Sequence, residues 1–141
     1  MAADPRVRDV RERFERSTFH NWIGMRLDRV EPGAVDVALD LEAHHMNLVG
    51  IAHGGLLATV ADTATGLAMR SALEPRTTHV TTQLSITFLT PGTGGTVVAR
   101  GRVLRSGRRF GYAEADVVDG QGTLLARASA TFAIRPEAPA Q

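Results

Sequence analysis

The chain has 141 residues and a mass of 15.1 kDa, a length that suits one domain with a hydrophobic core large enough to need no disulfide or metal staple. It contains no cysteine, which excludes disulfides, thiolate zinc sites and a cysteine nucleophile. A formal net charge of +1 with scattered arginines gives no broad basic surface, so no nucleic-acid partner is expected.

The first segment, about 5–19, is predicted to form a short amphipathic helix, because Val7, Val10 and Phe14 recur at helical spacing among arginines and glutamates. The residues before it lack the apolar core of a signal peptide. The most apolar segment of the chain carries Asp62 and Arg70, which a membrane span would not tolerate. A cytoplasmic protein without a membrane partner is therefore expected.

A β-hairpin is predicted from Met25 to Leu41, where apolar and polar residues alternate on both sides of a Pro32-Gly33 turn. The next element, about 54–73, is predicted to be a helix with one broad apolar face. Many of its side chains are small: Ala58, Ala61, Ala64, Gly66 and Ala68.

Four strands are predicted in the second half, at about 80–88, 96–105, 108–118 and 123–134, joined by Gly-containing turns. In the first of them Val80, Leu84 and Phe88 are expected on one face, with Thr81 and Gln83 on the other. Residues 136–141 are expected to form a disordered tail.

One long helix with about six antiparallel strands is an α+β arrangement in which the sheet must cover the helix. The small helical residues allow a curved sheet to approach closely on several sides. We therefore predict a hotdog fold, with one central helix wrapped by the sheet and a short N-terminal helix. The domain is expected to span 1–135, with its core at about 24–134.

The most informative motif is Asn47, then His53-Gly54-Gly55, then Asp62 inside the apolar helix. A carboxylate in such a helix is costly to desolvate unless it has partners or a chemical task. Asp62 is either catalytic or a buried structural acid bonded to hydroxyls such as those of Thr59 or Thr65.

This motif resembles that of the hotdog acyl-CoA thioesterases of the phenylacetic acid degradation (PaaI-like) and 4-hydroxybenzoyl-CoA thioesterase type. The asparagine, the His-Gly-Gly and the acid occur together at the family's spacing, and 86–91 resembles its central strand. The resemblance covers about 24–134. It implies hydrolysis of an aryl- or medium-chain acyl-CoA, without a cofactor.

Thioester hydrolysis needs a donor for the developing oxyanion and a group that attacks or activates water. The Gly54 N–H at the positive end of the helix suits the first role, and Asp62 suits the second, as nucleophile or as general base. Asn47 can hold the carbonyl or the water, and His53 can polarise the thioester. Thr81 matches a position where members of the family often carry a hydroxyl that helps to orient the acid or its water.

Simpler readings exist for three of these residues. Asn47 can close a turn, and His53 can merely support the loop. Thr82 takes the place of Thr81 if the strand slips by one residue.

Geometry adds an inference about assembly. Gly54 and Asp62 are eight residues apart, which is about 12 Å along a helix, so one carbonyl cannot contact both. A symmetric dimer with two shared sites would bring the glycine of one subunit to the acid of the other. The family resemblance implies the same homodimer, and a homotetramer made of two such dimers.

The remaining candidates concern substrate binding. Gly55 and Leu56 begin the helix, and the acyl pocket is expected to involve Leu56, Leu57, Met69 and the N-terminal helix. A cluster flanking a hairpin turn either clamps the phosphates of coenzyme A or makes an edge soluble, and consists of Arg105, Arg108 and Arg109. No metal site is expected, because His44 and His45 point to opposite faces of a strand.

Two other functions are weighed against hydrolysis. A hotdog hydratase or dehydratase would pair a histidine with an acid, but the chain lacks an Asp-x-Asn-Pro-x-His signature. A non-catalytic protein that binds acyl-CoA would keep the fold without turnover. The joint presence of Asn47, Gly54 and Asp62 argues against it.

Overall fold

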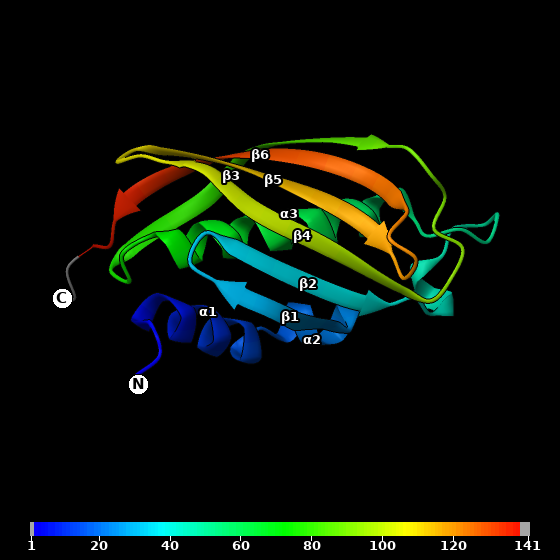
Figure 1. The fold of residues 1–141 in the computed structure, drawn as a ribbon, viewed down its shortest axis with the longest axis horizontal. Helices are drawn as coiled ribbons and strands as arrows, with labels where there is room; N and C mark the ends of the chain where they lie inside the picture. The colour runs from blue at the N-terminus through cyan, green and yellow to red at the C-terminus, as the bar shows by residue number, and fades with distance from the viewer. Residues whose placement is uncertain (1, 139–141) are drawn as a thin grey trace.

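The computed structural model describes residues 2–138 and confirms the predicted hotdog architecture (Figure 1). A six-stranded antiparallel sheet curves around one long helix. In chain order the elements are α1 (Pro5–Arg16), α2 (Thr18–Ile23), β1 (Met25–Glu31), β2 (Ala34–Asp40), a 3-10 turn η1 (Ala43–His45), α3 (Gly54–Ala72), β3 (Thr77–Phe88), β4 (Thr96–Ser106), β5 (Phe110–Asp119) and β6 (Leu124–Pro136).

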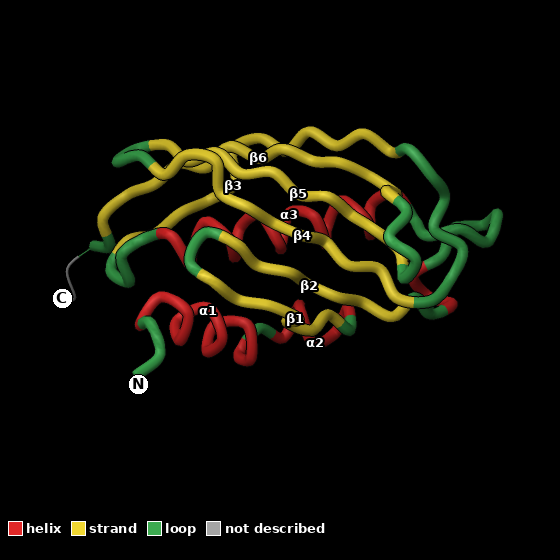
Figure 2. Tube along the Cα trace, in the orientation of Figure 1, coloured by secondary structure: helices red, strands yellow, loops and turns green. Residues whose placement is uncertain are grey.

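The strands follow the order β1-β2-β4-β5-β6-β3, so β1 and β3 form the two edges of the sheet. Helix α3 lies behind the sheet in Figures 1 and 2 and contacts all six strands. Helices α1 and α2 run beside β1. The 12-residue edge of β3 has no such cover within residues 2–138.

Small residues let the sheet approach the helix closely. Gly101 of β4 lies directly against the backbone of α3, where a Cβ atom would stand 2.6 Å from the Ala64 carbonyl carbon. Ala61, Ala64 and Ala68 on the facing side of α3 are fully buried. The prediction that small side chains allow this approach is therefore confirmed.

The N-terminal segment forms two helices where one, about 5–19, was predicted. Ser17 ends α1 with extended backbone, and its hydroxyl accepts the His20 N–H at 3.2 Å, which starts α2. Val10 and Phe14 bury the inner face of α1. Gly24 then ends α2 in the left-handed region, at φ 93°.

The side chains of β3 change face at a β-bulge that the alternating sequence did not reveal. Thr81 pairs with Phe132, and Gln83 pairs with the next residue of β6, so Thr82 is the extra residue of the bulge. Thr81 therefore lies on the same side as Leu84 and Phe88, toward α3, and not on the opposite face as predicted. Val80 is 63% exposed.

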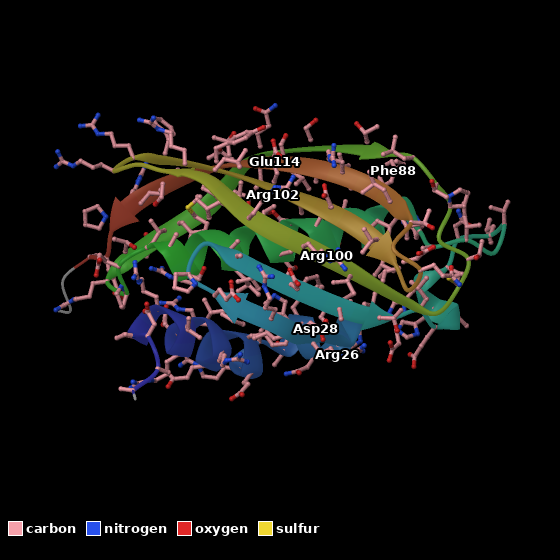
Figure 3. The ribbon with its side chains drawn as sticks, in the orientation of Figure 1. Arg26, Asp28, Phe88, Arg100, Arg102 and Glu114 are labelled. Carbon is pink, nitrogen blue, oxygen red and sulfur yellow. The ribbon has the colours of Figure 1, made fainter. Side chains whose placement is uncertain are left out.

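The opposite face of the sheet, turned to the viewer in Figure 3, is charged. Arg100, Arg102 and Glu114 stand there on β4 and β5. Arg102 forms ion pairs with Glu114 at 3.0 Å and with Asp116 at 3.4 Å.

The predicted tail begins within the last strand. Pro136 still pairs with Thr77, and the Glu137 N–H donates to the Arg76 carbonyl at 2.7 Å. Residues 139–141 of that tail lie outside the described residues. None of the helices in residues 2–138 has the length and hydropathy needed to span a bilayer.

The Gly101→Ala variant is predicted to lose stability, because its Cβ would collide with helix backbone that no side-chain rotation can move. The expected loss is about 3 kcal/mol of unfolding free energy, at the upper end for overpacking. Urea unfolding of the variant measures it. Gly120→Ala is the matched control, since a Cβ added there would meet no heavy atom within 4 Å beyond its chain neighbours. Equal stability of both variants would contradict this account of the packing.

Candidate active site

The loop before α3 is shaped by the Asn47 side chain. Its Oδ1 accepts the backbone N–H groups of Val49 at 3.0 Å and Ile51 at 3.2 Å. Asn47 thus closes a turn, which is one of the two roles predicted for it. With Oδ1 engaged by two donors, the Nδ2 amide group remains to donate a hydrogen bond to a ligand.

His53 is the N-cap of α3. Its Nδ1 accepts the Gly55 N–H at 2.9 Å, and its backbone carbonyl accepts the N–H groups of Leu56 and Leu57. Because Nδ1 accepts this hydrogen bond, the Nε2–H of the exposed His53 side chain is the ring's available donor. The side chain therefore supports the loop and presents one N–H donor.

The Gly54 N–H is the first donor of α3, and no acceptor within residues 2–138 is bonded to it. The Phe88 ring lies beside it, so close that a Cβ on Gly54 would be 3.2 Å from Phe88 Cζ. Asn47, Gly54, Leu57 and Phe88 all line one cavity of about 260 Å³. The N–H thus faces a space that can admit a ligand.

Asp62 lies half-buried on the outward stripe of α3, not in the core. The Thr81 hydroxyl donates to its Oδ1 at 2.8 Å. Neither hydroxyl considered for a structural role reaches the carboxylate: Thr59 donates to the Gly55 carbonyl, and Thr65 donates to the carbonyls of Ala61 and Asp62.

The bulge in β3 separates the roles of the two neighbouring threonines. Thr81 turns to Asp62, whereas the Thr82 hydroxyl donates to the Thr131 carbonyl of β6 at 3.1 Å. No arginine, histidine or lysine nitrogen in residues 2–138 lies within 4.0 Å of the Asp62 carboxylate. Asp62 is therefore held by a neutral hydroxyl and keeps a second oxygen for another partner.

A half-buried histidine fixes β3 to α3 near this acid. His79 Nε2 donates to the Gly66 carbonyl at 2.8 Å, one helical turn beyond Asp62. Burial lowers the pKa of His79 below the ordinary 6.5, an effect that the hydrogen bond to Gly66 partly opposes. The neutral His79 ring thus donates a hydrogen bond that holds β3 against α3.

One subunit does not bring the predicted site residues together. Asn47, His53 and Gly54 gather at the N-terminus of α3, while Asp62 and Thr81 meet two helical turns further on. The two groups face the same side of α3, and β3 runs alongside both, with Phe88 at the first and Thr81 at the second.

The predicted substrate-binding residues fall in two separate places. Gly55 and Leu56 line a cleft between α2 and α3. Arg108 and Arg109 line a cavity of about 450 Å³ at the start of β5, together with Arg135 of β6. Arg105, on β4, is not among the residues that line it.

No group of three His, Asp or Glu side chains within residues 2–138 is arranged to hold a metal ion. The predicted placement of His44 and His45 on opposite faces of a strand is wrong, because both lie in the 3-10 turn η1 and their ring centroids are 4.0 Å apart.

The comparison with known proteins defines the class of this fold and site. The model of the thioesterase superfamily matches residues 49–126, more than half of the chain. The chain therefore belongs to the thioesterase superfamily, and the expected hydrolase class is confirmed.

Individual relatives support the same assignment to the thioesterase superfamily. Acyl-coenzyme A thioesterase 13 of Homo sapiens is 30% identical over 98 residues, which cover 68% of this chain and 69% of the relative. A thioesterase family protein from Silicibacter pomeroyi superimposes with a TM-score of 0.88 at 27% identity, covering 93% of this chain and 98% of that one. A variant of the phenylacetic acid degradation protein PaaI from Thermus thermophilus gives 0.76 at 30% identity, covering 83% and 98%.

Sequence reasoning missed several residues around the site. Phe88 was read as one member of an alternating strand, and its contact with Gly54 had no local signal. No local sequence signal pointed to His79 or Arg135. His79 bonds Gly66, and Arg135 lines a cavity with Arg108 and Arg109, all of which are distant in the sequence. Trp22, the only tryptophan, was a signal that could have been used.

The lowered pKa of His79 predicts a stability that falls in mild acid. Below about pH 6.5 the unfolded chain takes up a proton that the folded His79 resists, so unfolding is favoured progressively as the pH falls from 7 to 5. His79→Gln is expected to make thermal stability less dependent on pH in this range. Exposed His44→Gln is the control and should keep the wild-type slope. His20, whose pKa burial also lowers, accounts for a residual slope. An unchanged slope in His79→Gln would refute the assignment.

Proposed function

We propose that this protein is an acyl-CoA thioesterase that hydrolyses an aryl- or medium-chain acyl-CoA to the free acid and coenzyme A. The observation that carries the proposal is the Asp62 carboxylate, oriented by the Thr81 hydroxyl at 2.8 Å and without a cationic partner in residues 2–138. The name of the human relative, acyl-coenzyme A thioesterase, supports the substrate class.

The chemistry follows from the two groups of residues. The Gly54 N–H and the Asn47 Nδ2 donate to the thioester oxygen as it becomes an oxyanion. A preorganised donor of this kind contributes about 3 to 4 kcal/mol in the transition state. The positive end of α3 favours the same negative charge.

Asp62 completes the reaction in one of two ways. As a general base it takes a proton from water, whose oxygen attacks the thioester carbon; the C–S bond then breaks, and the leaving thiolate takes a proton. As a nucleophile it forms a mixed anhydride that water hydrolyses. In both routes Thr81 holds the carboxylate in position.

The separation of the two groups supports a site shared by two subunits. A two-fold axis that brings Gly54 to the partner's Asp62 passes midway between these residues, at Ala58 of α3. It also passes midway between Phe88 and Thr81, near Leu84 and Ser85 of β3. The free edge of β3 is available there for antiparallel pairing with its own copy.

This axis also gives the arginines a role. Antiparallel pairing of two β3 strands places the Thr77 end of one beside the Phe88 end of the other. The cavity with Arg108, Arg109 and Arg135 lies near the Thr77 end, where β6 joins β3 to β5. We propose that these arginines contact the phosphates of coenzyme A bound at the partner's Gly54. We further propose that two such dimers form a homotetramer and that the protein is cytoplasmic.

Asp62→Asn is predicted to lower kcat by at least about a hundredfold, because the amide can neither attack nor accept the proton of water. Release of thiol from phenylacetyl-CoA or octanoyl-CoA, followed with a thiol reagent, measures it. Thr81→Val should reduce kcat to a lesser degree, and Thr82→Val is its matched control with near wild-type kcat. Undiminished turnover in Asp62→Asn would overturn the proposed role.

The shared site predicts complementation between inactive subunits. Asp62→Asn and Asn47→Ala should each be inactive as homodimers, whereas each heterodimer regains one intact site. Equal mixing with random exchange should restore about a quarter of the wild-type activity. Mass spectrometry verifies the exchange. Full exchange of subunits without recovered activity would overturn the shared site. It would mean that the two groups of residues act within one chain or do not act together.

A further inference from the structure

Helix α2 and the first two turns of α3 enclose a second cleft, of about 320 Å³, on the side of α3 away from Phe88. Trp22 and Ile23 form one wall, and Leu56 and Thr59 form the other. His53 also lines the cleft. The cleft therefore adjoins the helix N-terminus on which the proposed chemistry depends.

We propose that this cleft receives the acyl group of the substrate and that Trp22 is the residue that selects aryl and medium-chain acyl groups. The proposal rests on the thioesterase function proposed above and names the part of the same site that sets its specificity.

The position of the cleft relative to Gly54 carries the argument. Successive residues of a helix point about 100° apart, so Gly54 and Leu57 face the Phe88 cavity while Leu56 and Thr59 face the α2 cleft. When the thioester carbonyl is held at Gly54, the acyl group and the coenzyme A portion must extend from it in different directions. The proposed arginine contacts take coenzyme A to the β3 side, which leaves the α2 side for the acyl arm.

The cleft has the size and chemistry of an acyl pocket. A cavity of about 150 Å³ holds one benzene ring, so 320 Å³ accommodates a ring or a chain of several methylenes. Trp22, Ile23 and Leu56 contribute apolar side chains to its lining, beside the imidazole rings of His44, His45 and His53. The Thr59 hydroxyl donates to the Gly55 carbonyl at 2.8 Å and so brings no unpaired donor into the cleft.

A buried histidine holds the two walls in position. His45 Nδ1 accepts the Glu42 N–H at 3.0 Å, so its Nε2 must be the donor that bonds the Ile23 carbonyl at 2.8 Å. The His45 carbonyl accepts the His53 N–H at 2.9 Å. One residue, 4% exposed, thus ties the end of α2 to the N-cap of α3, and the cleft is preformed.

Trp22 is 79% exposed in the isolated chain, although an indole is among the largest apolar side chains. Within residues 2–138 no aromatic ring stacks on it. An acyl group in the cleft would cover this surface, which gives the exposed tryptophan a ligand of matching chemistry.

The sole tryptophan makes the proposal directly testable, because all indole fluorescence of the protein comes from Trp22. A non-hydrolysable thioether analogue of octanoyl-CoA is expected to shift the emission to shorter wavelength as it binds, whereas coenzyme A alone is expected to leave it unchanged. Binding of the analogue, measured by calorimetry, without any change in emission would overturn the proposal.

A kinetic comparison tests selection by acyl length. Trp22→Ala should lower kcat/KM about tenfold or more for octanoyl-CoA and phenylacetyl-CoA, with little change for the shortest acyl-CoA that is turned over. Trp22→Phe should recover most of the loss. Phe19→Ala is the matched control, since Phe19 is 49% exposed on the same helix but does not line the cleft. Equal losses on short and long substrates would overturn the proposal.

The two proposals fail separately. A shifted emission without any thiol release from acyl-CoA would refute the hydrolysis and keep the acyl pocket. Thiol release with an unchanged profile in Trp22→Ala would refute the pocket and keep the hydrolysis.

Discussion

The straight run of α3 between Gly54 and Asp62 is the constraint on which the site depends. Eight residues of helix hold the Gly54 N–H and the Asp62 carboxylate about 12 Å apart, on the stripe of α3 that lies along the edge strand β3. Strand β3 fixes both ends, since Phe88 packs beside Gly54 and Thr81 bonds Asp62. Neither end can approach the other within one chain, which supports the proposed site shared between two copies.

The polar groups of α3 are arranged so that few of them remain for a ligand. The hydroxyls of Thr59, Thr63 and Thr65 all donate to backbone carbonyls of the preceding turn. Gly55 donates to the His53 ring. The Gly54 N–H and one Asp62 oxygen are what this stripe offers, one donor and one acceptor, which matches the two demands of thioester hydrolysis.

The parts of this structure that the sequence predicted are those governed by periodicity and spacing. The apolar face of α3 and the small residues facing β4 are repeating patterns, so the fold followed from them. The bulge at Thr82 follows from pairing with β6, a partner that the alternation within β3 does not encode. Thr81 nevertheless contacts Asp62 as expected from the family resemblance, because the bulge turns its side chain toward α3.

Other differences have the same origin. Ser17 divides the N-terminal helix because its hydroxyl caps α2, a local competition that the apolar spacing of Val10 and Phe14 does not report. Asp62 was expected inside an apolar helix, yet it lies at the edge of the apolar face. Helical periodicity predicts which residues form the apolar face of α3. Which residues at the boundary of that face remain accessible depends on how the sheet packs against the helix.

The placement of α2 separates specificity from chemistry. Trp22 lies outside the core, and α2 is joined to the site through the hydrogen bonds of His45. A substitution on the outward face of α2 therefore changes the wall of the cleft without altering the packing of α3 against Gly101. Because Gly54 and Asp62 both stand on α3, such a change leaves their positions intact. The proposed acyl pocket can thus be altered through α2 without disturbing the packing of α3.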